Sequence, residues 1–289
     1  MIEQHIDIIT LPASLDRLEA LNMDNGSTQG FTNARLKSYP VKTVMQVANQ
    51  PIFPLPGHAY KRPYEVPPPG MGKDHERAMQ ESKRRARAKV KDIALCNHFE
   101  YFFTWTLDGS LIDRYNPKEV YAKVRSFLGN AVQRNGFSYV LVPEHHKQKE
   151  GEDLPAIHMH GLCSLGTVPI VRATSKAGTP LNDKQGRPIY NMPTWTWGFS
   201  TCVPLDDQYE RTINYLTKYI TKDDSKIFGK WYLASRNLAK EPELIPLVPI
   251  PYDSFRDEHK LQTHEQYESA VCAGLNIISE DFPPLGPPQ

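Results

Sequence analysis

The chain has 289 residues, a formal net charge of +1, 23 % charged residues and 39 % hydrophobic residues. This composition is typical of a soluble protein that is long enough to bury a real core in one or two domains. No run of eighteen apolar residues occurs and the N-terminus is polar and acidic, so we expect neither a membrane span nor a secretory signal. The four cysteines lie dozens of residues apart, which fits a reducing cytoplasm better than a disulfide framework or a zinc knuckle.

Proline and charge are distributed unevenly along the chain. Of the 25 prolines, 9 fall in residues 1–72 and 8 in residues 242–289. Because proline fixes φ and removes a backbone donor, we expect both flanks to be extended, loop-like arms. The C-terminal flank also carries two bases and eight acids, a net charge of −6, so it is expected to be an acidic tail. The folded domain is then expected over residues 73–241.

A basic segment opens this expected domain. Residues 73–91 contain eight bases and three acids, a net charge of +5, and residues 75–95 have the apolar periodicity of a helix. Such a run favours phosphate binding, because neutralised phosphates release counterions. A solvated, salt-bridged helix face is the alternative interpretation. The candidate nucleic-acid contacts in this helix are Lys83, Arg84, Arg85, Arg87 and Lys89.

The remaining elements alternate between strands and helices. Asn116 as cap, Pro117 at the first position and Gly136 at the end predict one helix clearly. We expect strands over 99–108, 137–144, 156–163 and 194–203, a polar insertion with short strands over 164–194, and helices over 116–135 and 206–222, the last capped by Asp206 or Asp207. The pattern predicts an α+β fold in which helices cover an antiparallel sheet.

The strand over 156–163 contains the first candidate site. Its His158-Met159-His160 sequence places two imidazoles on one face of the strand, a geometry that suits a shared metal ion. Glu144, at the end of the neighbouring strand, is the candidate third ligand. Each histidine taken alone is as well explained by core packing. His145 and His146 are competing ligands, but we expect them to be exposed at the start of a loop.

The last helix supplies a second group of functional side chains. Tyr215 and Tyr219 are four residues apart, as are Lys218 and Lys222, and we expect all four on one polar side, opposite the apolar stripe. Nearby cations can make a phenol a competent nucleophile. Tyrosines that pack over a sheet edge are the alternative interpretation.

Two further groups are candidate DNA contacts. Lys230 and Arg236 lie beside Trp231 just after the tyrosine helix, and cations mixed with aromatic side chains suit single-stranded nucleic acid. Trp195 and Trp197 alternate onto one face of the strand over 194–203. For these two residues, core packing is favoured over stacking on unpaired bases.

The order of these motifs resembles the HUH endonucleases, which are named for their His-hydrophobic-His sequence. It resembles most closely the rolling-circle replication initiators of single-stranded DNA phages and plasmids. The segments FTWTL, VPEHH, HMHG and TWTWGFST carry this resemblance, and YLTKYITK is similar to the paired-tyrosine motif of gene A-type initiators. The resemblance covers about residues 76–236.

The resemblance implies a ferredoxin-like palm and a specific chemistry. A divalent ion, Mg²⁺ or Mn²⁺, would be held by His158, His160 and Glu144 at a single-stranded DNA origin. A tyrosine would attack phosphorus, leaving a 5′-phosphotyrosine and a 3′-hydroxyl primer, and the second tyrosine would cleave the regenerated origin. Lys218 or Lys222 would position DNA or stabilise charge. Host DNA polymerase and helicase in the bacterial cytoplasm are the implied partners, since no GxxxxGK[ST] motif is present.

Two other interpretations stay open at this point. A relaxase or transposase of a mobile element would use the same chemistry in a different biological role. A metal-containing DNA-binding protein without turnover would bind DNA but form no covalent adduct. A zinc hydrolase is less well supported, because the sequence has no HExxH motif.

Overall fold

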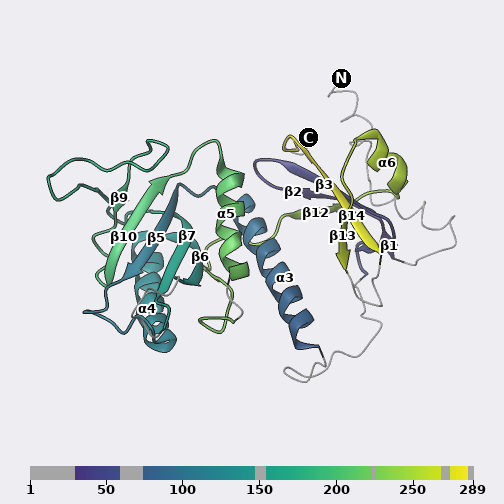
Figure 1. The fold of residues 1–289 in the computed structure, drawn as a ribbon. Coiled ribbons are helices and arrows are strands. Elements are labelled where there is room, and N and C mark those ends of the chain that lie inside the picture. Colours follow the sequence, from purple (N-terminus) through teal and green to yellow (C-terminus); the bar gives the residue numbers. More distant parts are fainter. Residues whose placement is uncertain (1–29, 59–73, 147–153, 223–224, 268–273, 286–289) are drawn as a thin grey trace. The chain divides into compact units, whose positions relative to one another are not determined.

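The structure is a computed structural model, and it describes residues 30–58, 74–146, 154–222, 225–267 and 274–285 (Figure 1). The chain divides into two compact units, one formed by Pro69–Glu241 and the other by Met1–Pro68 together with Pro242–Gln289. The described residues form helices and antiparallel sheets, so the predicted α+β class is confirmed. Expectations for the N-terminal residues 1–29 and for the loop over 147–153 lie outside the described residues. None of the described helices is long and apolar enough to cross a membrane.

The unit Pro69–Glu241 is built on one twisted antiparallel sheet. Its described strands follow the order β11-β6-β7-β5-β10-β9-β8. The elements are α3 (His75–Cys96), β5 (Tyr101–Leu107), α4 (Pro117–Asn135), β6 (Ser138–His145), β7 (Ile157–Ser164), β8 (Val171–Arg172), β9 (Tyr190–Asn191), β10 (Gly198–Pro204), α5 (Tyr209–Lys222) and β11 (Leu233–Ala234). The strands β6 and β7 are antiparallel neighbours, as their short connection predicts.

The two faces of this sheet carry different helices. Phe103, Trp105 and Met159 point to one face and form a hydrophobic core with Val124 and Leu128 of α4. The opposite face is covered by α5, beside which α3 packs (Figure 1). Side chains alternate along each strand, so every second residue of β5, β6 and β7 is directed towards the helix α5.

The helix α4 begins and ends as its sequence predicts. The Asn116 side chain accepts hydrogen bonds from the backbone N–H groups of Lys118 and Glu119, at 3.1 and 3.4 Å. Pro117 is the first helical residue, and Gly136 follows the helix in the left-handed conformation with φ of 67°.

The expected strand over 194–203 is too long at its N-terminal end. β10 starts at Gly198, whose φ of 148° bends the chain, and whose missing side chain lets the backbone approach the carbonyl oxygen of Thr106. Trp195 therefore lies outside the strand. Its ring is 3 % exposed and stacks on Trp105, with ring centroids 4.4 Å apart, so the expected core packing is confirmed for this residue. Trp197 is partly buried against the same core.

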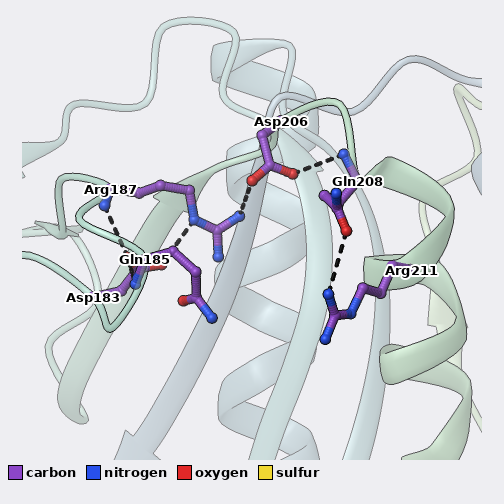
Figure 2. Close-up of polar contacts among 6 residues, drawn as sticks. All are labelled: Asp183, Gln185, Arg187, Asp206, Gln208 and Arg211. Carbon is purple, nitrogen blue, oxygen red and sulfur yellow. Dashed lines mark hydrogen bonds and ion pairs between the residues drawn. The ribbon is translucent and has the colours of Figure 1, made fainter.

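The prediction that Asp206 or Asp207 caps the tyrosine helix is wrong. α5 begins at Tyr209, and the carbonyl of Gln208 accepts the first helical hydrogen bond, from the Thr212 N–H at 3.0 Å. Figure 2 shows that the Asp206 carboxylate instead accepts hydrogen bonds from the Gln208 N–H and from Arg187, both at 3.0 Å. Since Arg187 also binds Asp183 at 2.8 Å, these contacts connect the polar insertion to the start of α5 (Figure 2).

The flanks do not form the expected loop-like arms. Their described residues form a five-stranded antiparallel sheet in the order β12-β2-β3-β14-β13, and β12 from the C-terminal flank pairs with β2 from the N-terminal one. The elements are β1 (Phe31–Thr32), β2 (Ala34–Ser38), β3 (Thr43–Ala48), β4 (Phe53–Pro54), β12 (Glu243–Pro246), α6 (Tyr252–Glu258), β13 (His264–Tyr267) and β14 (Leu275–Phe282).

Proline content misleads here because of where the prolines lie. Pro40 lies in the turn between β2 and β3, Pro246 ends β12, and Pro251 immediately precedes α6. The segments between such prolines alternate between buried and less buried residues, as in TVMQVA of β3. Their apolar residues, among them Leu36 and Met45, form a core of their own. The expected acidic tail thus contributes strands to a folded unit.

Candidate functional site

The sheet places the predicted metal ligands side by side on the face that α5 covers. β6 and β7 pair so that Glu144 lies opposite His158 and Val142 lies opposite His160. On the other side of β7, β5 places Thr104 opposite His160. The two histidines and the glutamate therefore share one face, as strand alternation predicts.

His160 is the most firmly held of these residues. It is 8 % exposed, its Nε2 lies 2.8 Å from Oε2 of Glu144, and its Nδ1 lies 3.1 Å from Oγ1 of Thr104. Its ring stacks on Tyr219, with ring centroids 3.9 Å apart and planes 6° apart. The ring of Phe102 lies 6.2 Å away. Contacts at both nitrogens and on the ring face fix the orientation of the imidazole.

The carboxylate of Glu144 is buried and bound by two cationic or potentially cationic groups. In addition to His160, the ammonium group of Lys222 lies 2.5 Å from Oε1. Burial alone would raise the pKa of Glu144, but the hydrogen bonds from His160 and Lys222 outweigh it and lower the pKa below its ordinary value. Glu144 is therefore ionised at neutral pH.

His158 lies next to this pair in a neutral form. Burial, followed by the proximity of His146 and His160, lowers its pKa from 6.5 to about 4. Its ring stacks on His146, with centroids 4.5 Å apart, and His146 is exposed as expected at the start of the loop. A neutral imidazole is the form that can bind a metal ion.

The chemistry of these three residues fits a divalent metal ion. Two imidazoles and an ionised carboxylate share one face, and the hydroxyl of Thr104 holds the far nitrogen of His160, as outer partners of metal-bound histidines do. Within the described residues, however, no three His, Cys, Asp or Glu side chains are arranged as a formed metal site. Lys222 supplies the positive charge at Glu144 in this arrangement.

The two tyrosines of α5 differ in their surroundings. Tyr219 is 5 % exposed and faces the sheet, whereas Tyr215 is 50 % exposed. The Tyr219 hydroxyl donates a hydrogen bond of 2.5 Å to the Tyr215 hydroxyl. Burial, together with the bond to Tyr215, raises the pKa of Tyr219. The expectation that all four polar residues share one exposed face is therefore wrong, because Tyr219 lies at the border of the buried stripe.

The two lysines of the helix differ as well. Lys222 lies at the end of α5, where its ammonium group is 4.4 Å from the centre of the Tyr219 ring and binds Glu144. Lys218 is exposed, and its side chain forms no ion pair with any residue that the structure describes. The structure thus brings together Tyr215, Tyr219, Lys222, His160 and Glu144, with Lys218 outside this cluster.

Three residues that build the site were not among the predicted ones. Thr104 and Phe102 reach it from β5, where the alternation of FEYFFTWTLD puts them on the non-core face. Tyr209 fixes the start of α5, because its hydroxyl lies 2.8 Å from the Ala94 carbonyl oxygen and 2.9 Å from that of Asn97. Only the pairing of strands and helices reveals these contacts.

The predicted DNA contacts are dispersed. Arg87 is exposed on α3, Arg84 is partly exposed, and Arg85 is exposed and pairs with Glu81 at 3.3 Å. Lys89 pairs with Glu241 at 2.6 Å. Lys83 is 4 % exposed, and its ammonium group lies 5.6 Å from the Trp231 ring centre. Lys230 and Arg236 are exposed on the segment after α5.

Comparison with known families supports the same function class. A family model for the replication-associated protein ORF2 matches residues 100–224. This match supports a family of rolling-circle replication initiators, and it spans β5 to α5, including every candidate metal ligand and both tyrosines. No curated protein and no solved structure matches the chain. α3 and the segment after α5 lie outside the matched residues.

Proposed function

We propose that the unit Pro69–Glu241 starts rolling-circle replication by cutting and rejoining single-stranded DNA through a covalent tyrosine intermediate. The observation that carries this proposal is the cluster of two tyrosine hydroxyls, 2.5 Å apart, beside the His160–Glu144 pair. Oriented phenols next to imidazole, carboxylate and ammonium groups are what transfer of a phosphodiester to tyrosine requires.

Tyr215 is the residue that attacks first in this proposal. Half of its surface is exposed, so a DNA phosphate can reach its hydroxyl, whereas Tyr219 is buried. Tyr219 donates its hydroxyl proton towards the Tyr215 oxygen, and such a bond stabilises negative charge that develops there. Tyr219 is then first a positioning residue, and it is available for a second cleavage once Tyr215 is esterified.

The proposed reaction conserves the number of phosphoester bonds. The Tyr215 oxygen bonds to phosphorus and loses its proton, the bond from phosphorus to the 3′ oxygen breaks, and that oxygen gains a proton. The products are a 5′-phosphotyrosine and a free 3′-hydroxyl that a polymerase can extend. Attack of a 3′-hydroxyl on the phosphotyrosine reverses the step and joins the strand. Lys222, next to the tyrosines, supplies positive charge for the phosphate oxygens.

A divalent ion, Mg²⁺ or Mn²⁺, belongs to this proposal. His158, His160 and Glu144 would hold it, and it would polarise the phosphodiester. Thr104 keeps the His160 ring in place. Binding of the ion would compete with the Lys222–Glu144 contact, since both place positive charge at one carboxylate.

The test is a search for the covalent adduct on denaturing gels. Single-stranded oligonucleotides that tile the parent replicon are mixed with the whole protein and Mn²⁺ or Mg²⁺, with EDTA as the metal-free arm. We expect a 5′-linked adduct that EDTA abolishes, that Tyr215→Phe abolishes, and that Tyr219→Phe weakens. Tyr252→Phe, in the other unit, is the matched control and keeps full adduct formation.

Two results would contradict the proposal in different ways. Absence of an adduct on every oligonucleotide, with DNA binding intact, would favour the DNA-binding protein without turnover. An adduct that survives Tyr215→Phe and disappears only in Tyr219→Phe would reverse the order of the tyrosines. A relaxase or transposase would form the adduct on DNA from a transfer origin or an element end, but not on the replication origin.

A further inference from the structure

A cavity of about 490 Å³ opens at the β11 edge of the sheet, in the same unit as the tyrosines. Its walls come from α3, α4, β6 and the segment over 226–240. Tyr139 of β6, which lines it, packs on Phe137 in the core under α4, whereas Glu144 of the same strand is directed to the α5 face. The cavity is therefore distinct from the tyrosine cluster. Its volume lies in the range of sites that bind small molecules.

The lining of the cavity is cationic and aromatic. Arg125, Lys226, Lys230 and Lys240 line it, together with the aromatic rings of Tyr121, Tyr139, Trp231 and Tyr232, and no Asp or Glu is among the lining residues. None of the four cations has a carboxylate partner within the described part of the chain. Such a set of residues attracts an anion that also carries a flat ring.

Trp231 is held in place as part of this wall. Its indole N–H donates a hydrogen bond of 2.9 Å to the Ser82 hydroxyl of α3. The ammonium groups of Lys83 and Lys226 lie 5.6 and 5.8 Å from its ring centre. The ring is 8 % exposed, so α3 fixes the wall before any ligand arrives. A preformed wall lowers the entropic cost of binding.

We propose that this cavity binds one nucleotide of the single-stranded DNA substrate outside the scissile step, with its phosphate on the lysines and its base against the aromatic wall. The inference rests on the proposed nicking function, which requires a single strand to be held while a tyrosine cuts it. Exposed cations at the rim suit the phosphates on either side of the bound nucleotide. α3 and residues 226–240 lie outside the match to the replication-associated family, so the cavity is assembled largely by residues flanking the matched core.

The experiment measures DNA binding without cleavage. The whole protein carrying Tyr215→Phe is titrated into fluorescein-labelled dT20, and anisotropy is followed at several KCl concentrations. We expect Lys230→Ala/Lys240→Ala to weaken binding about 5- to 30-fold and to lower the salt slope by about 1.4, because two phosphates lose their cation and single strands contribute about 0.7 each. Lys176→Ala/Lys184→Ala, two exposed lysines of the insertion, is the matched control with unchanged affinity.

A photochemical readout locates the base. With 5-iododeoxyuridine in place of one thymidine, we expect cross-links at Trp231, Tyr232 or Tyr121. Wild-type affinity and salt slope in the Lys230/Lys240 variant, or cross-links confined to other segments, would overturn the inference. Free dTMP that binds in the micromolar range through the same lysines would overturn it too, since the site would then serve a free nucleotide.

The adduct assay separates this inference from the proposed function. Adduct formation together with unaltered binding of the lysine variant would refute the cavity alone. Loss of binding in the lysine variant, with no adduct from the wild-type protein on any oligonucleotide, would refute the nicking function and leave the cavity as a DNA site.

Discussion

Tyr209 gives the most quantitative test of how the tyrosine helix is held. It is the first residue of α5, and its hydroxyl lies within hydrogen-bond distance of the carbonyl oxygens of Ala94 and Asn97, while the Phe99 N–H donates to it at 3.3 Å. Tyr209→Phe removes these bonds and leaves partly buried backbone groups without a partner. We expect the free energy of unfolding to fall by about 1–3 kcal/mol at pH 8.

The same hydroxyl makes stability depend on alkaline pH. Burial raises the pKa of Tyr209 from 10.0 to about 12. A raised phenol pKa means that the folded state keeps its proton longer, so the stabilisation is complete below pH 10 and is lost as the pH rises through 12. Between pH 8 and pH 11.5 the wild-type protein should lose about 1.9 kcal/mol through this group, taking 1.36 kcal/mol per pKa unit.

Urea unfolding followed by tryptophan fluorescence measures both effects. All four tryptophans lie between residues 105 and 231, so the signal reports the unit that contains α5. We expect the wild-type protein to be about 1–3 kcal/mol more stable than Tyr209→Phe at pH 8, and this difference to shrink by about 1.9 kcal/mol at pH 11.5. The difference isolates Tyr209, because every other tyrosine is common to both proteins. A difference that stays constant between the two pH values would refute the buried, hydrogen-bonded phenol.

Three further predictions concern packing and buried groups. Gly161→Ala should destabilise the protein by about 1–3 kcal/mol in urea unfolding, since an added Cβ would lie 2.5 Å from the Phe103 ring and the Val140 carbonyl, whereas Gly129→Ala, in open space on α4, should stabilise it by about 0.5–1 kcal/mol. Because the pKa of Glu144 is lowered, its stabilisation is present above the ordinary carboxyl pKa and is lost as pH falls through the folded value, so Glu144→Gln should flatten the acid limb of a stability–pH curve. The buried Cys163 and Cys202, whose thiol pKa values burial raises (that of Cys202 to about 12), should resist iodoacetamide at pH 8 in native protein and react in urea, as peptide mass mapping would show.

Local signals predicted the secondary structure of the central unit well. Asn116, Pro117 and Gly136 act through backbone geometry within a few residues, so their consequences do not depend on the rest of the fold. Strand alternation likewise placed His158 and His160 on one face. The start of β10 was missed because it depends on Gly198, whose approach to the carbonyl of Thr106 is a contact between strands.

The arrangement of the flanks could not be found from local composition. β12 pairs with β2 across about two hundred residues of sequence, and proline counts say nothing about such pairings. The relevant signal is short: TVMQVA and LNIISEDF contain no proline and have β-branched residues at a strand-like density. Averaging over the flanks hid these segments.

The rotation of α5 about its own axis explains both the success and the error of the site prediction. Helical periodicity places Tyr215, Tyr219 and Lys222 close together, but it does not say how far into the interface each one lies. The sheet decides this, because Tyr219 stacks on His160 while Lys222 binds Glu144. These contacts orient the helix so that Tyr219 is buried and Tyr215 is exposed beside it. The interactions that dock α5 on the sheet therefore also distinguish the two hydroxyls, and chemically identical phenols acquire different access to a DNA strand.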